Sequence, residues 1–104
     1  MTLNIRHHGL EITPAINQYI EEKIQHLSKY LESIEHVDVE IGKKNSHEMY
    51  CKVNVQIAGE VIQVERMDED LYKAIDKVKD HLRVEITDWK KRQEDRRSVS
   101  EEAA

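Results

Sequence analysis

Residues 51–64 decide the fold, and they read CKVNVQIAGEVIQV. Apolar and polar side chains alternate on both sides of Ala58-Gly59-Glu60, which is the period-two pattern of strands with one buried face. The chain turns at this tripeptide, so the stretch predicts an antiparallel hairpin. The side chains expected to face the core are Cys51, Val53, Val55, Ile57, Ile62 and Val64.

Two further strands and a helix are expected on the N-terminal side of the hairpin. Leu3 and Ile5 alternate with polar neighbours, as do the apolar residues of 37–41. Between them, Thr13 suits a helix cap and Pro14 the first helical position, which predicts a helix of about five turns. Its apolar stripe is Ile16, Ile20, Ile24, Leu27 and Leu31. Residues 42–47 are polar and predict a loop.

The segment after the hairpin predicts one long helix. Asp68 suits its N-cap, and apolar residues recur at helical spacing after it. This second stripe is Leu71, Ile75, Val78, Leu82, Ile86 and Trp89. A helix to about Arg92 spans roughly 35 Å, more than a small sheet needs for cover, so its last turns are expected to project. Residues 98–104 are predicted to be a disordered tail.

The element order β-α-β-β-β-α predicts an α+β fold with a four-stranded mixed sheet and two helices packed on one face. A right-handed helical crossover makes the first strand parallel to the second and leaves the other sheet face towards solvent. The length of 104 residues suits one domain, expected at residues 1–97 and followed by the tail 98–104.

Composition argues against several classes of protein. Cys51 is the sole cysteine, so no intramolecular disulfide can form, and its place in an apolar alternation favours packing over catalysis. No apolar run approaches the roughly 18 residues of a membrane span, and the N-terminus lacks the regions of a signal peptide. The expected location is therefore the cytoplasm.

No spacing in the sequence points to a metal, a cofactor or a catalytic centre. The six histidines have no cysteine partner and no pair at the i to i+4 spacing that favours zinc. Phosphate-binding glycine loops, nucleophile elbows and Cys-His dyads are also missing from the sequence. We therefore expect a protein that binds rather than catalyses, with a metal-dependent enzyme as the weaker alternative.

Charge is distributed unevenly along the chain. The net charge is -5, yet residues 73–97 hold 9 Lys and Arg against 6 Asp and Glu, whereas residues 1–72 hold 7 against 13. On a helical wheel, four of these cations fall within about 40° of one another. They form what we call the basic ridge: Lys79, Arg83, Lys90 and Arg97.

The basic ridge has two readings. Lys and Arg on a projecting helix suit contact with nucleic-acid phosphates. They also stabilise a helix C-terminus through its dipole, and mixed charge is common on any long exposed helix. The open sheet face, with Tyr50, Lys52, Asn54 and Gln56, has a similar ambiguity. It could contact unstacked bases, stay solvated or pair with a second copy.

Two separated runs resemble a known family. The first is Leu3-Asn4-Ile5 followed by residues 11–16 (EITPAI), continuing through Tyr19-Ile20 and Lys23 to Leu27 and Tyr30. The second is residues 70–76 (DLYKAID). Over about residues 1–92 the chain resembles the hibernation-promoting factor and ribosome-associated inhibitor family, also called sigma-factor modulation proteins.

The resemblance implies a non-enzymatic bacterial stationary-phase factor. Members sit on the small ribosomal subunit, in the channel used by mRNA and transfer RNA, and silence translation reversibly. Carried over by position, the family's basic residue of the first helix matches Lys23, and one lysine near the end of the last helix matches Lys90. Without the long members' C-terminal dimerisation domain, the chain is expected to be a short form.

Three of the family's usual cations are replaced in this chain. The family continues after the Tyr-x-Ala-Ile-Asp run with Lys before Leu, then Arg-Gln-Leu and alternating lysines. Here His81, Val84 and Asp88 stand in that region. Arg83, Lys91 and Arg92 are expected to compensate for the positive charge lost at these positions.

The prediction is therefore a protein that binds ribosomal RNA and blocks the channel by steric occlusion, without a cofactor. The residues predicted to bind rRNA are Lys23, Lys79, Arg83, Lys90, Lys91 and Arg92. The alternative is a homodimeric or protein-interaction module that works through its open sheet face without binding RNA. A homodimer is possible in the first reading but not expected.

Overall fold

The computed structural model describes residues 1–28 and 32–103, with side chains through residue 27 and from 32 to 95. Its element order confirms the predicted β-α-β-β-β-α arrangement. The elements are β1 (Thr2–His8), α1 (Pro14–Ser28), β2 (Ile34–Lys43), β3 (Met49–Ile57), β4 (Glu60–Asp68) and α2 (Leu71–Ala103). The expected helical residue Leu31 lies outside the described residues.

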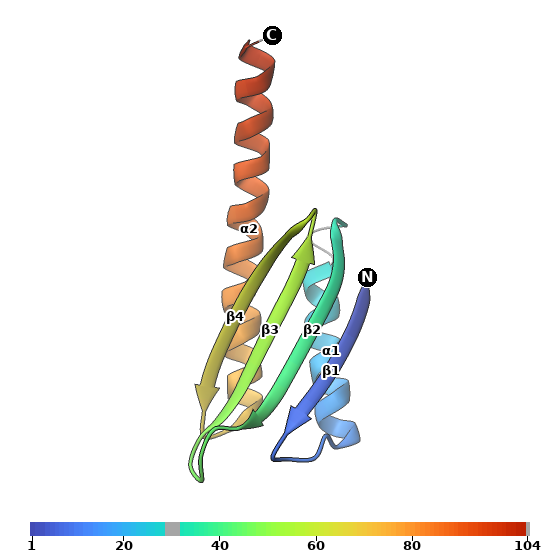
Figure 1. Ribbon diagram of the computed structural model, residues 1–104, viewed down its shortest axis with the longest axis vertical. Coiled ribbons are helices and arrows are strands. Elements are labelled where there is room, and N and C mark those ends of the chain that lie inside the picture. The colour runs from blue at the N-terminus through green and yellow to red at the C-terminus, as the bar shows by residue number, and fades with distance from the viewer. Residues whose placement is uncertain (29–31, 104) are drawn as a thin grey trace.

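The four strands form one mixed sheet in the order β1-β2-β3-β4. β1 runs parallel to β2, and the other two neighbouring pairs are antiparallel. Both helices lie on the same face of this sheet, α1 behind β1 and β2, and α2 behind β3 and β4 (Figure 1). The predicted fold class is confirmed, and none of the described helices covers the opposite sheet face.

The core lies between the sheet and the two helices. The inward side chains of β2 and β3 are almost fully buried, and so is the whole predicted stripe of α2 from Leu71 to Trp89. Cys51 is part of this core, where burial raises the pKa of its thiol to about 12. A thiol with so high a pKa is a poor nucleophile at neutral pH, which agrees with its predicted packing role.

The β3–β4 turn is a two-residue hairpin loop. Ile57 pairs with Glu60, and the two residues between them both have positive φ, 48° at Ala58 and 82° at Gly59. Type I′ hairpin turns need this left-handed backbone at both central positions. Gly59 adopts it without strain, whereas the Cβ of Ala58 makes it unfavourable.

The boundaries of β2 differ from the sequence prediction, since the strand begins at Ile34 rather than at Val37. Gly42 and Lys43 belong to β2 rather than to a loop. The ring of Tyr50 fills the place where a side chain at position 42 would stand, since an added Cβ would come within 2.5 Å of it. Glycine therefore lets the strand continue beneath the ring.

The cap of α2 also differs from the prediction. The N-cap is Asp70, whose carboxylate accepts the backbone N–H of Tyr72 at 2.9 Å. Asp68 is instead the last residue of β4, and its carboxylate accepts the backbone N–H of Asp70 at 2.9 Å. The cap of α1 is as predicted, because Thr13 Oγ1 accepts the N–H of Ile16 at 3.1 Å.

Helix α2 continues past the expected end near Arg92 and has 33 residues. Its indole at Trp89 donates to Glu60 Oε2 at 2.6 Å, which fastens the helix to the β3–β4 turn. Beyond this level α2 stands clear of the sheet (Figure 1). Residues 90–103 hold no glycine or proline that would end a helix. The expected disorder of residues 98–104 stays a prediction.

We predict that Ala58→Asn stabilises the protein, because asparagine tolerates the left-handed conformation better than alanine does. The free energy of unfolding in a urea titration should rise by about 0.5–1 kcal/mol. The matched change Gly59→Ala should lower it by about 1 kcal/mol, since φ is 82° there and open space surrounds the site. Equal effects of the two changes would contradict the turn geometry.

Candidate nucleic-acid interface

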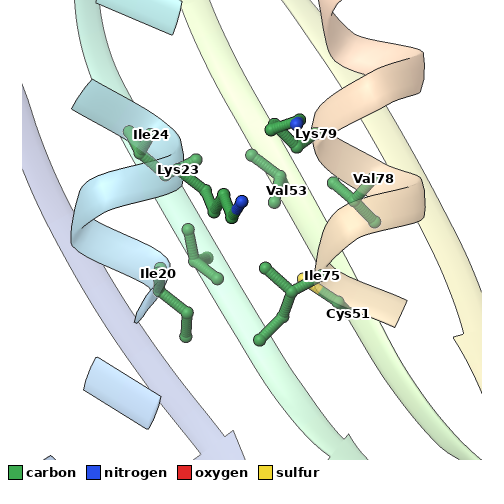
Figure 2. A pocket seen from close by; sticks show the side chains of 9 residues that line it. Ile20, Lys23, Ile24, Cys51, Val53, Ile75, Val78 and Lys79 are labelled. Atoms are coloured by element: carbon green, nitrogen blue, oxygen red, sulfur yellow. The ribbon is translucent and has the colours of Figure 1, made fainter. Parts of the chain in front are cut away.

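The two helices leave an apolar cleft between them, and a lysine from each helix closes over it. Figure 2 shows Lys23 reaching from α1 and Lys79 from α2 into the space between the helices, above Val53 of the sheet. Each lysine side chain is about three-quarters buried, with 26% exposed. Long lysine side chains can cover apolar surface with their stems while the ammonium group stays in water. The fold thus brings together two cations that lie far apart in the sequence.

A second hollow shares these two lysines and opens to solvent. We call it the inter-helix hollow, and it is lined by Lys23, His26, Leu27, Lys79 and Arg83. Among the described residues that line it there is no carboxylate. Three permanent cations around one concave surface favour an anion of the size of a phosphate group.

Lys23 is held in place by a contact between the helices. The hydroxyl of Tyr19 donates to Asp76 Oδ1 at 2.5 Å, and the ammonium of Lys23 lies 3.8 Å from the same oxygen. That ammonium also lies 5.0 Å from the centre of the Tyr19 ring. The hydrogen bond to Asp76, with burial, raises the pKa of Tyr19 to about 12. Asp76 therefore orients Lys23 and offsets part of its charge.

The six predicted rRNA-binding residues separate into two groups. Lys79 and Arg83 of the basic ridge join Lys23 at the inter-helix hollow, and exposed Lys90 continues the same flank on the projecting part of α2. Lys91 lies about 100° around the helix from Lys90, and Arg92 lies about 160° away. The structure thus gathers four of the six on one side and leaves two on other faces of α2.

The three positions where the family resemblance leads us to expect cations lie away from the basic ridge. His81, Val84 and Asp88 are about 120–180° around α2 from the centre of the basic ridge. His81 Nε2 lies 3.3 Å from Glu85 Oε1 on that side. His81, Val84 and Asp88 therefore belong to the outer face of α2 and are not among the described residues that line the inter-helix hollow.

The open sheet face has balanced charge. One row across the four strands reads Arg6, Glu40, Lys52 and Glu65 in register. Arg6 Nη2 lies 3.8 Å from Glu40, and the hydroxyl of Tyr50 donates to Glu40 Oε2 at 2.9 Å. This hydrogen bond lowers the pKa of the Glu40 carboxyl. Alternating signs give the face little attraction for phosphates.

The sequence prediction missed His26 as a member of the hollow. Its spacing of three from Lys23 puts both on one helix face, which was an available signal. Elsewhere in the described part of the chain, no cluster of three or more His, Cys, Asp or Glu side chains is placed to hold a metal ion. No helix in that part is long and apolar enough to cross a membrane.

Comparison with known protein families identifies the family of this chain. The family described as sigma 54 modulation protein / S30EA ribosomal protein matches residues 3–94. The chain belongs to this family. The match extends over β1 through the first part of the projecting segment of α2, so it includes all six predicted site residues. The resemblance noted in the sequence is confirmed.

Relatives within the family are named for ribosome hibernation. A ribosome hibernation promotion factor of Bacillus subtilis (strain 168) is 32% identical over 88 residues, which cover 83% of this chain and 47% of that protein. The chain thus spans about half the length of this relative. A ribosome hibernation promoting factor of Azotobacter vinelandii is 30% identical over 96 residues, covering 92% of this chain and 89% of that protein.

Solved structures share the fold. The N-terminal domain of Protein Y from Thermus thermophilus superposes with a TM-score of 0.78 at 29% identity, covering 86% of this chain and 99% of that one. A ribosomal subunit interface protein from Coxiella burnetii gives a TM-score of 0.81 at 21% identity, covering 86% and 98%. Its low identity supports the fold alone.

We predict that Tyr19→Phe lowers the free energy of unfolding by about 1 kcal/mol, because it leaves Asp76 without its donor between the helices. Tyr72→Phe is the matched control. Tyr72 meets Tyr19 edge to face at 4.9 Å, and no hydrogen bond of its hydroxyl is among those of the described residues. Thermal or urea unfolding should show little change for this control. Equal losses in the two variants would contradict the assigned role of the Tyr19 hydroxyl.

Proposed function

We propose that this protein is a ribosome hibernation factor that binds the RNA of the small ribosomal subunit. It would occupy the channel used by mRNA and transfer RNA and reversibly inhibit translation. The observation that carries the proposal is the gathering of Lys23, Lys79 and Arg83 around one hollow, with Lys90 on the same flank. Two relatives are named ribosome hibernation factors, which supports the ribosome as the partner of this hollow.

The proposed mechanism is binding without chemistry. Cations of the hollow and ridge contact phosphates of the RNA backbone, and each contact releases counterions. The α/β body, fixed by its buried core and by the Tyr19 to Asp76 contact, then fills space that message and transfer RNA need. No covalent bond is made or broken, so the protein acts as a cytoplasmic steric block rather than an enzyme.

The projecting part of α2 gives Lys91 and Arg92 their proposed role. This segment stands clear of the sheet, so RNA could meet it from more than one side (Figure 1). Lys90 would extend the contact made at the hollow, Lys91 would reach phosphates on the neighbouring side of α2, and Arg92 would reach phosphates on the nearly opposite side. Binding by this chain alone needs neither a second copy nor a cofactor.

Charge reversal of the ridge provides the main test. The triple variant Lys79→Glu, Arg83→Glu and Lys90→Glu should reduce cosedimentation with small ribosomal subunits at least tenfold, because three phosphate contacts become repulsive. The slope of log affinity against log salt should also fall by about two to three units. Circular dichroism should show an unchanged fold, since the ridge lies beside the buried stripe and not within it.

The matched control reverses three lysines away from the ridge. Lys43, Lys44 and Lys52 lie on β2, in the following loop and on the open sheet face. Converting these three lysines to Glu changes the net charge by the same amount as the ridge variant does. This control should keep most of its affinity for small ribosomal subunits. Equal losses in the two triple variants would mean that total charge alone governs binding. A loss confined to the control would favour the alternative in which the open sheet face binds a partner.

A separate measurement addresses the other two predicted residues. The double variant Lys91→Glu and Arg92→Glu should lower the salt slope by about one to two units, because at most two phosphate contacts are lost. Cosedimentation with small subunits across a salt series measures this change. An affinity and slope equal to those of the unmodified protein would confine the interface to the flank of the basic ridge.

A further inference from the structure

Among the described residues that line the inter-helix hollow, His26 contributes an imidazole, the kind of side chain that commonly acts as a pH switch in proteins. It lies in the last turn of α1, one turn after Lys23, and it is exposed. No ion pair of its imidazole is found among the described residues. The other polar side chains among the described lining residues are the basic groups of Lys23, Lys79 and Arg83.

Three carboxylates near this hollow have partners, and two of them pair with lysines of the hollow itself. On α1, Glu22 stands one turn before His26 and accepts a hydrogen bond from Gln18 Nε2 at 3.3 Å. On α2, Asp76 is bound by Tyr19 and Lys23, and Asp80 lies 3.3 Å from Lys79. Among the described residues, no acidic side chain lines the hollow beside the imidazole.

A phosphate held in the hollow would place negative charge within reach of this imidazole. Nearby anions favour the protonated form of histidine, and the protonated ring adds a charge-assisted hydrogen bond to the phosphate. Lys23 and Arg83 bring the anion there from both helices. The imidazole is thus placed to complete the cationic surround once RNA is bound.

We propose that His26 is a further phosphate ligand of this site and that RNA binding takes up a proton at its imidazole. This inference rests on the proposed function. Because the bound state holds more protons than the free state, affinity for RNA increases as pH falls from about 7.5 to 5.5. The protein would hold its target more tightly under acidic conditions and release it as pH recovers.

The test measures affinity for small ribosomal subunits at pH 5.8 and pH 7.6 with ionic strength held constant. For the unmodified protein, affinity should be about threefold to tenfold higher at the lower pH. His26→Gln should remove most of this difference by lowering affinity at pH 5.8. His26→Lys, which carries a permanent charge, should bind tightly at both values.

His47→Gln is the matched control, because it replaces a histidine in the β2–β3 loop, at the end of the sheet away from the projecting helix (Figure 1). It should keep the pH dependence of the unmodified protein. If His26→Gln also keeps that dependence, or if His26→Lys binds weakly at both pH values, the inference is wrong while the proposed function stands. If the unmodified protein binds at neither pH, the proposed function itself fails.

Discussion

The packing of two helices against a single face of the sheet is the constraint on which the rest of this structure depends. The parallel pairing of β1 with β2 requires a crossover, and α1 supplies it on the side that α2 also covers. The apolar stripes then fix how both helices face the sheet. A cleft remains between them, and the polar positions at its rim become neighbours. Lys23 and Lys79 meet there only because their helices share this face.

Local physical signals account for how well the fold could be predicted. In β2 to β4 and in both helices, one side is buried in the core. The apolar residues on that side recur at strand or helix spacing, so the sequence alone predicts these elements. The details that escaped prediction depend on distant partners. Gly42 stays in β2 because the Tyr50 ring covers it, and the link from Trp89 to Glu60 joins residues 29 positions apart.

The candidate site also combines residues that local sequence signals predict with residues that depend on distant partners. Helical periodicity gathers the basic ridge, and the family resemblance pointed to Lys23. The spacing of three between Lys23 and His26 put both on one helix face, but only the packing of the two helices shows that this face meets Lys79 and Arg83.

The acidic net charge and the basic hollow are compatible because electrostatic attraction at contact distance is local. On the open sheet face, cations and carboxylates alternate in register across the four strands, whereas the described residues that line the hollow include no carboxylate. A molecule with one basic surface and an acidic remainder has a preferred orientation towards RNA.

The central claim is that the inter-helix hollow, rather than the open sheet face, meets ribosomal RNA. A cryo-electron microscopy map of the protein bound to the small ribosomal subunit tests this claim most directly. We expect density for RNA phosphates beside Lys23, Lys79 and Arg83, with the projecting part of α2 against RNA and the open sheet face turned away. A map in which the open sheet face lies on the subunit and the hollow faces solvent would contradict it.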